Sequence, residues 1–254
     1  MDASHSCRKL DQLLSYILSL TSYEPRLNSM YQVIQEVSNW DIQPHTVILN
    51  LALDDYLLLE KDFEDSCSLN LEIQIVENLG PAKKLIPTLL LQKDLPIVTI
   101  DDDLHYPPNF ISKVLDEYKL FPNCIIAGRA HKILFGDEGD ILPYSEWHGE
   151  TSAENGPSKE LFPTGVGMVL YPQKSLHIDV LDTDTYKENC FYNDDFWFYF
   201  QGRRAGTLVR RVPFAIELKY IPDSQEVGLY HENRKRNEVY LKNLVNLYGN
   251  PLFI

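Results

Sequence analysis

The sequence predicts an α/β protein with a central mixed, mostly parallel sheet flanked by helices. Two observations support this prediction: short apolar runs alternate with amphipathic segments, and polar or acidic turns follow the apolar runs. Strands that alternate with helices are typical of βαβ units and of a parallel sheet. In open sheets of this kind, ligands bind at the carboxyl ends of the strands. The polar turns therefore mark the expected binding edge.

The individual elements follow from local periodicity. Short apolar or alternating runs predict strands at residues 16–20, 47–53, 71–76, 97–100, 124–127 and 168–171. Apolar residues at spacings of three and four predict helices at residues 27–37, 83–91 and 109–120, and another helix beginning at Asp194. Residues 135–159 lack such a pattern and are expected to form surface loops. We expect a single domain over residues 1–254, because no linker or low-complexity tract divides the chain.

Composition narrows the class of protein. The chain has 254 residues, of which 44% are hydrophobic and 24% charged, as in ordinary globular proteins. Its net charge of −14 speaks against nucleic acid as a partner. Four widely spaced cysteines without a CxxC pair argue against a zinc site or a disulfide scaffold, and favour a reducing, cytoplasmic location. Because no stretch of about 18 apolar residues occurs, we predict no membrane span.

Three consecutive carboxylates, Asp101, Asp102 and Asp103, follow the apolar run 97–100. Adjacent carboxylates repel one another unless a positive charge lies nearby. Mg²⁺ or Mn²⁺ is a natural partner, because both ions prefer oxygen ligands and are often completed by substrate phosphates. In an extended segment, Asp101 and Asp103 would face one ligand and Asp102 would turn aside. The pattern favours a metal-bound diphosphate, and a solvated acidic turn is the alternative.

Two further motifs are candidates for binding or catalysis. Gly165 and Gly167 lie beside the run 168–171, where glycine permits close approach of the backbone to a bulky ligand. A β-bulge or a tight turn would explain them equally well. Asp194 and Asp195 begin an aromatic segment, and carboxylates are favourable at a helix N-terminus. Helix capping is therefore the alternative to a catalytic role.

Six segments in order carry a resemblance to a known family. They are SLTSYEPRL (19–27), LGPAKKLIP (79–87), IVTIDDDLHYPP (97–108), GRAHKI (128–133), FPTGVGMVLYP (162–172) and NDDFW (193–197). The chain resembles bacterial glycosyltransferases of the GT-A fold, close to the inverting family 2 group. The resemblance extends from about residue 14 to the C-terminus. It implies a nucleotide-binding half at about 14–130 and an acceptor-binding half at about 131–254.

The resemblance also implies roles for individual residues. Those implied to bind the nucleotide sugar are Thr21, Ser22, Arg26, Lys84, Asp101, Asp102, Gly165 and Gly167. Asp101 and Asp103 correspond to a DXD motif that holds Mn²⁺ or Mg²⁺, with Asp103 favoured for direct metal contact. His231 is a further candidate metal ligand, and a solvent-exposed histidine is the alternative. Asp195 is implied as the catalytic base, with Asp194 as second choice.

Three residues in the second half of the chain are further candidates for ligand contact. Arg129 and His131 are candidates for contact with the donor's phosphate or sugar, and packing or surface pairing is the alternative. Trp197 is spaced with other aromatic residues on the expected helix, which favours the core over an acceptor site.

The function implied is that of a metal-dependent, inverting glycosyltransferase in bacterial surface polysaccharide synthesis. It would move a sugar from a nucleotide-diphosphate donor, foremost a UDP-sugar, to a glycan or lipid-linked acceptor. The basic cluster Arg234-Lys235-Arg236 would then provide peripheral contact with the cytoplasmic face of the inner membrane. One alternative is a nucleotidyltransferase that makes a nucleotide sugar, although residues 19–27 lack the glycine-rich basic loop usual in that class. The other is a non-catalytic sugar-nucleotide or glycan-binding module.

Overall fold

The computed structural model of the protein describes residues 15–91, 94–214, 217, 219–222, 224 and 230–254, and the side chains of residues 65 and 230–235 lie outside this description. The strands are β1 (Ile17–Thr21), β2 (Thr46–Leu51), β3 (Leu71–Ile75), β4 (Ile97–Thr99), β5 (Leu104–His105), β6 (Ile125–Ala127), β7 (Ala130–Lys132), β8 (Leu161–Pro163), β9 (Val169–Tyr171), β10 (Val209–Arg211) and β11 (Lys219–Tyr220). The α-helices are α2 (Leu27–Val37), α3 (Leu53–Tyr56), α4 (Phe63–Ser66), α5 (Ile86–Leu89), α6 (Phe110–Leu120), α7 (Thr183–Cys190), α8 (Asp194–Arg204) and α9 (Tyr230–Tyr248). Short 3₁₀ turns are η1 (Glu24–Arg26), η2 (Gly80–Lys84), η3 (Tyr144–Glu146) and η4 (Ile178–Leu181).

The central sheet has seven strands in the order β10-β6-β9-β4-β1-β2-β3. Strands β3, β2, β1 and β4 run parallel to one another, and β10 runs parallel to β6. Strand β9 is antiparallel to both of its neighbours, β4 and β6. The predicted mixed, mostly parallel α/β sheet is therefore confirmed.

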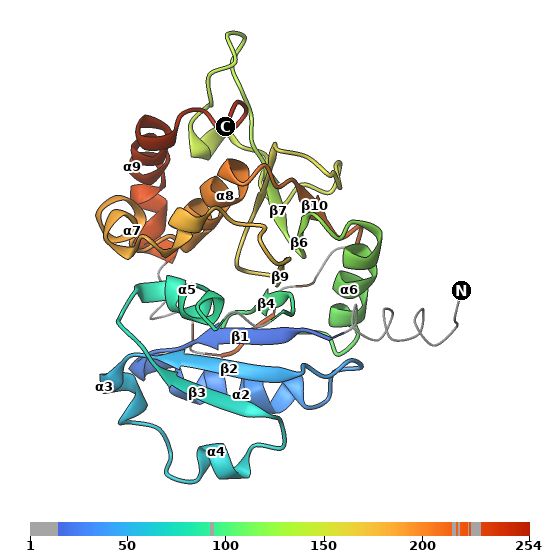
Figure 1. Ribbon diagram of the computed structural model, residues 1–254, viewed down its shortest axis with the longest axis vertical. Coiled ribbons are helices and arrows are strands. Elements are labelled where there is room, and N and C mark those ends of the chain that lie inside the picture. Colours follow the sequence, from blue (N-terminus) through green and yellow to red (C-terminus); the bar gives the residue numbers. More distant parts are fainter. Residues whose placement is uncertain (1–14, 92–93, 215–216, 218, 223, 225–229) are drawn as a thin grey trace.

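Helices cover both faces of this sheet (Figure 1). One core is built under α2 and α6, and the other under α5, α7, α8 and α9. Successive strand residues point to opposite faces. On β9, for example, Leu170 joins the first core, whereas Val169 and Tyr171 join the second. Strands that are buried on both faces have few positions for polar side chains, which explains the continuous apolar runs in the sequence.

Most predicted elements are found, and the differences have local causes. The predicted helix 83–91 is interrupted: η2 ends at Lys84 and α5 begins at Ile86. Pro87 has no N–H to donate inside a continuous helix but is tolerated in a first turn. The predicted strand 47–53 ends at Leu51, and Leu53, half-exposed, begins α3 instead. Strands β7, β8 and β10 were not predicted, because β7 and β10 contain charged residues and β8 ends in a proline, so no apolar run marks them in the sequence.

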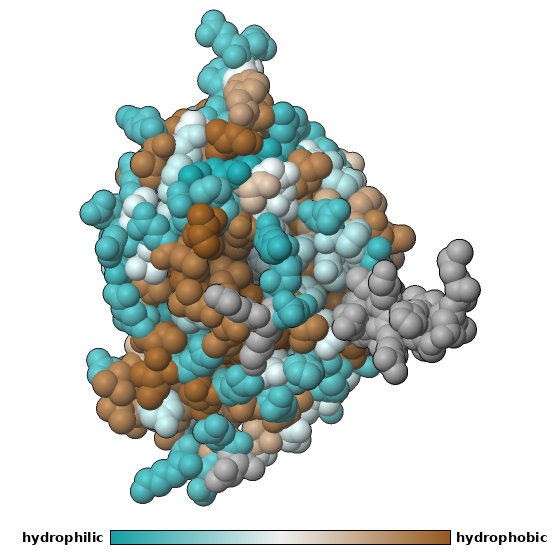
Figure 2. Space-filling view, in the orientation of Figure 1, coloured by the Kyte–Doolittle hydropathy of each residue, from teal (hydrophilic) through white to brown (hydrophobic). Residues whose placement is uncertain are grey.

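Residues around the acidic tract 137–140 lie at the surface, as predicted. The bridge between Phe135 and Ile141 closes a small hairpin, which protrudes at the top of Figure 1. Figure 2 shows hydrophilic residues covering this protrusion, while apolar residues gather near the centre of the face in view.

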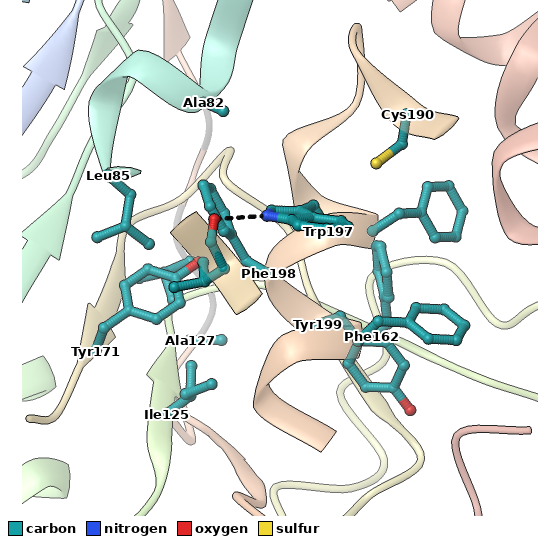
Figure 3. Close-up of a cluster of buried hydrophobic side chains, with 14 of the residues drawn as sticks. Ala82, Leu85, Ile125, Ala127, Phe162, Tyr171, Cys190, Trp197, Phe198 and Tyr199 are labelled. Atoms are coloured by element: carbon teal, nitrogen blue, oxygen red, sulfur yellow. Dashed lines mark hydrogen bonds between the residues drawn. The ribbon is translucent and has the colours of Figure 1, made fainter. Parts of the chain in front are cut away.

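Helix α8 carries an aromatic run into the second core. Trp197, Phe198 and Tyr199 are almost fully buried, so the expectation that Trp197 belongs to the core is confirmed. Figure 3 shows Trp197 packed between this helix and its neighbours, with its indole N–H bonded to the carbonyl of Val180 at 3.0 Å. Burial of a large aromatic side chain with its polar atom satisfied fixes the position of α8, and with it the two aspartates at its first turn.

Among the residues that the structure describes, each helix is too short or too polar to cross a membrane.

Candidate functional site

A cleft of about 1430 Å³ opens at the edge of the sheet where β1, β2 and β4 end. Its lining includes the segment that follows β1, the triple Asp that follows β4, and the first turn of α8. Because β9 is antiparallel to β4, its amino-terminal end reaches the same edge and brings Gly165 into the cleft. The sheet therefore gathers segments from the whole chain at the edge that the sequence indicated.

Arg26 joins two of the three consecutive aspartates. Its Nη1 lies 3.1 Å from Asp102 Oδ1 and 3.0 Å from Asp103 Oδ2. The hydroxyl of Ser22 donates to the other oxygen of Asp102 at 2.6 Å. The expectation that Asp102 turns aside was wrong, because β4 ends at Thr99 and the alternation of an extended strand does not continue through the triple Asp. Burial raises the pKa of Asp102, and the charge of Arg26 opposes that rise.

Lys84 lies between aspartates from two distant parts of the chain. Its Nζ is 2.9 Å from Asp101 Oδ1 and 3.2 Å from Asp194 Oδ2. Burial alone would lower the pKa of Lys84, but the charges of Asp101, Asp194 and Asp195 raise it well above its ordinary value. The ammonium group is thus held protonated at the centre of a carboxylate cluster, where it offsets their mutual repulsion.

Asp195 lies next to this cluster at the start of α8. Its Oδ1 accepts a hydrogen bond from the backbone N–H of Gly165 at 2.8 Å. Burial, and secondly the charge of Asp194, raise the pKa of Asp195 to about 7. Burial also raises the pKa of Asp194, and Lys84 opposes that rise. Helix packing through Trp197 holds both carboxylates at the base of α8, where partial removal from water makes the ionised form costly.

The two predicted glycines have different surroundings. A Cβ on Gly165 would lie 2.7 Å from Lys84 Nζ and 3.0 Å from Asp195 Oδ1, so only glycine leaves room for both groups. Gly167 has a φ of +107°, and its carbonyl oxygen packs against Gly128, whose Cβ would approach it to 1.9 Å. Gly165 therefore shapes the cleft, whereas Gly167 permits close contact of two backbone segments.

Several cleft residues were not singled out from the sequence. Lys83, next to Lys84 in η2, donates to the carbonyl of Ser22 at 3.2 Å and lies 3.5 Å from Asp55 Oδ2. Asp55 is one of the acidic residues in the turn after β2, so its position at a strand end was the available signal. Burial lowers the pKa of Lys83, while Asp55 opposes that fall.

A buried polar network anchors this lysine-bearing segment to the sheet. Asn50 donates to the hydroxyls of Ser19 at 3.2 Å and Thr88 at 3.0 Å, and those two hydroxyls are 2.7 Å apart. Thr88 belongs to α5, and its partners belong to β1 and β2. Side-chain networks of this kind restrict neighbouring elements to one arrangement. The sequence offered no signal for it, because each of the three residues is unremarkable by itself.

The donor set of the cleft is suited to a cation. Carboxylates outnumber basic side chains along the lining, which includes Asp101, Asp102, Asp103, Asp194 and Asp195. Within the described part of the chain, however, no three His, Cys, Asp or Glu side chains are close enough to hold a metal ion by themselves. A bound Mg²⁺ or Mn²⁺ would need substrate oxygens to complete its coordination, as is common for Mg²⁺.

Thr21 also lines the cleft, and its hydroxyl donates to the carbonyl of Asn50 at 2.7 Å. His231 belongs to α9, but its side chain lies outside the described residues, so its predicted role as a metal ligand stays a prediction. The side chains of Arg234 and Lys235 are outside them as well, and Arg236 stacks over the ring of Tyr192 at 4.8 Å.

No protein-family model and no curated protein matches this chain. Several solved structures match it. An inositol-1-phosphate CTP transferase from T. maritima matches with a TM-score of 0.50 and 11% identity over 92% of this chain and 97% of that one. A 4-diphosphocytidyl-2C-methyl-D-erythritol synthase from Anaerococcus prevotii has a TM-score of 0.49 and 14% identity over 88% and 95% of the two chains. A UTP-bound UGPase from Acinetobacter baumannii has a TM-score of 0.44 and 9% identity over 90% and 96%.

The likeness to the CTP transferase shows that the chain has the nucleotide-diphospho-sugar transferase fold. It also corrects the expected function. That solved structure is named a CTP transferase, which matches the nucleotidyltransferase alternative and not a glycosyltransferase that acts on a glycan or lipid-linked acceptor. The sequence motifs misled because a fold does not determine a function: acidic residues at the strand ends of this fold do not specify which group is transferred.

Proposed function

We propose that this protein is a nucleotidyltransferase, which joins a nucleotide from a nucleoside triphosphate to a phosphorylated acceptor such as a sugar phosphate. The observation that carries the proposal is the meeting of Arg26, Lys83 and Lys84 at the carboxyl ends of β1, β2 and β4, within the large cleft. The fold shared with a CTP transferase supports the same activity.

Lys83 and Lys84 provide basic groups in the cleft although the turn after β1 lacks a glycine-rich basic loop. A glycine-rich basic loop was expected after β1 in this class, and the turn there contains Arg26 but no glycine. The turn η2 supplies the missing features instead: Gly80 adopts a φ of +56°, and Lys83 and Lys84 end the turn inside the cleft. Basic groups on a short, fixed turn can bind phosphates whatever the position of that turn along the chain.

The reaction needs little acid or base chemistry from the protein. A phosphate oxygen of the acceptor forms a bond to the α-phosphorus of the nucleoside triphosphate. The bond from that phosphorus to the bridging oxygen breaks, and pyrophosphate leaves with the electron pair. Because the acceptor phosphate is already ionised at neutral pH, no base is required. Positioning and charge stabilisation are therefore the main contributions expected of the site.

In this proposal Asp194 and Asp195 act as positioning residues. They hold the Lys84 ammonium toward the phosphates, which replaces the catalytic-base role expected from the resemblance. Asp101 and Asp103 would hold Mg²⁺ or Mn²⁺, which neutralises charge on the departing pyrophosphate when it is bound. Ser22 and Arg26 keep the aspartate-bearing turn in place through Asp102.

The test is pyrophosphate release from ATP, CTP, GTP and UTP in the presence of Mg²⁺ and a panel of sugar 1-phosphates. We expect release with one nucleotide and one acceptor class, and a fall of at least about 100-fold in kcat for Lys84→Met, because a buried charge aimed at phosphates is lost. Lys242→Met, an exposed substitution on α9, is the matched control. The proposal fails if no triphosphate binds or releases pyrophosphate with any acceptor while the folded protein is intact.

A further inference from the structure

A second basic centre lies in the same cleft, away from Lys84. Arg129, in the segment that joins β6 to β7, donates from Nη1 to the hydroxyl of Thr164 at 3.1 Å and from Nη2 to Glu150 Oε1 at 2.7 Å. Arg129, Thr164 and Glu150 all line the cleft. One branch of the guanidinium is therefore held by the protein frame, while the other binds a carboxylate.

Glu150 is a solvent-exposed partner of the Arg129 guanidinium and can be displaced from it. Its side chain is 64% exposed, whereas that of Arg129 is 19% exposed. Water can solvate the Glu150 carboxylate when it leaves Arg129, so this ion pair contributes less to stability than a fully buried pair would. The Glu150 carboxylate can therefore leave Arg129 at small cost.

The backbone of Glu150 is nevertheless held in an unusual conformation. Its φ of +50° lies in the left-handed region, which side chains other than glycine, Asn and Asp rarely adopt. The N–H of Glu150 donates to Nδ1 of the buried His131 at 2.9 Å, and this bond holds the residue beside Arg129. Strained residues of this kind are concentrated at ligand sites. A carboxylate kept on an arginine by a strained turn has the charge and the planar acceptor geometry of an anionic ligand.

We infer that Arg129, positioned by Thr164, forms the binding site for the phosphate of the acceptor, and that the Glu150 carboxylate occupies this site until a phosphomonoester displaces it. The chemical class of the ligand follows from the donor: a guanidinium suits phosphate oxygens. The hydroxyl of Thr164 positions this guanidinium, because it accepts from Arg129 and donates to the carbonyl of Val166 at 3.1 Å. Assigning this phosphate to the acceptor rests on the proposed nucleotidyltransferase function; binding of the anion itself does not.

The position of this site relative to Lys84 agrees with that role. Thr164 is adjacent to Gly165, whose N–H binds Asp195 and whose α-carbon faces Lys84 Nζ. A phosphate bound to Arg129 would therefore lie next to the Lys84 cluster, which is proposed to receive the triphosphate, because adjacent residues contact the two sites.

The direct test is calorimetric titration with inorganic phosphate at low ionic strength. Glu150→Gln removes the competing charge and keeps the shape of the side chain. We expect its Kd for phosphate to fall about two- to fivefold, which corresponds to the loss of one exposed ion pair. Arg129→Gln is expected to raise the Kd at least tenfold. Glu146→Gln removes the same charge from an exposed neighbour that does not line the cleft, and its Kd should match that of the wild type.

Folding and function are separated by two further comparisons. Arg129→Lys keeps the charge but not the fork, so a Kd between those of the wild type and Arg129→Gln supports the site even if the latter is unstable. The inference is overturned if Glu150→Gln binds phosphate no better than Glu146→Gln does. It is also overturned if transfer proceeds and the acceptor KM is the same in wild type, Glu150→Gln and Arg129→Lys. If phosphate binding follows Arg129 and Glu150 as expected but no nucleotide is transferred, the anion site stands and the proposed function fails.

Discussion

Replacement of Lys84 by methionine tests the central ion cluster most directly. The substitution keeps an unbranched side chain of similar length but removes the ammonium that is 2.9 Å from Asp101 and 3.2 Å from Asp194. Removing one partner of a buried ion pair typically costs about 3–5 kcal/mol, because the other charge stays buried without compensation. Here more than one buried carboxylate loses its counter-ion. We therefore expect the free energy of unfolding at pH 8 to fall by about 4 kcal/mol.

The assay is urea denaturation followed by circular dichroism at pH 8 and pH 5. Burial, and secondly the charge of Asp194, raise the pKa of Asp195 to about 7, so Asp195 takes up a proton at pH 5 and its repulsion with the other carboxylates disappears. The loss caused by Lys84→Met should therefore shrink to roughly half at pH 5. Asp194→Asn in the same background should restore part of the stability at pH 8. Lys242→Met, on the exposed face of α9, should change stability by less than about 0.5 kcal/mol.

Two results would refute this reasoning. A loss below about 1 kcal/mol at pH 8 would mean that the cluster is solvated and that the ammonium is not its main counter-charge. A loss of equal size at pH 5 and pH 8 would mean that lost packing around the lysine stem, not charge, explains the effect.

Three further outcomes follow from the same contacts. Gly128→Ala places a Cβ 1.9 Å from the carbonyl oxygen of Gly167, so the free energy of urea unfolding should fall by at least about 3 kcal/mol. The control Gly206→Ala has open space around its Cβ but a φ of +74°, and should cost only about 1 kcal/mol. Equal losses in the two variants would contradict the predicted clash. Burial lowers the pKa of His131 to about 4, so the unfolded chain binds a proton that the folded protein does not as the pH falls below 6.5. The free energy of unfolding of the wild type should therefore fall by about 3 kcal/mol between pH 6.5 and 4, relative to that of His131→Asn. Parallel pH profiles of the two proteins would contradict this. Because the pKa of Asp195 is raised, its contribution to stability is present below its unfolded pKa and is lost as the pH rises to 7. The stability of Asp195→Asn relative to wild type should therefore rise with pH between 4 and 7, and a flat difference would contradict it.

The sequence by itself determined the class of the fold and the location of the cleft. Apolar runs ending in Thr21, Asp54 and Asp101 required buried strands with polar carboxyl ends, and hydrophobic burial on both faces leaves a three-layer arrangement as the stable solution. The helices 27–37 and 109–120 were predictable because their apolar stripes are regular and long. Lys84, Asp101 and Asp195 were chosen from the sequence, and all three lie together in the cleft.

Only the tertiary structure decided how these groups pair and what they are suited to do. Strand β9 runs antiparallel in the middle of the sheet, and this reversal brings Gly165 to Lys84 across some 80 residues of sequence. The end of β4 at Thr99 turns Asp102 toward Arg26, contrary to the strand alternation that the sequence suggested. The partnership of Arg129 with Glu150 has no local signal at all. The reason is physical: periodicity reports which face of an element is buried, whereas charge pairing depends on which distant segments packing brings within a few ångströms.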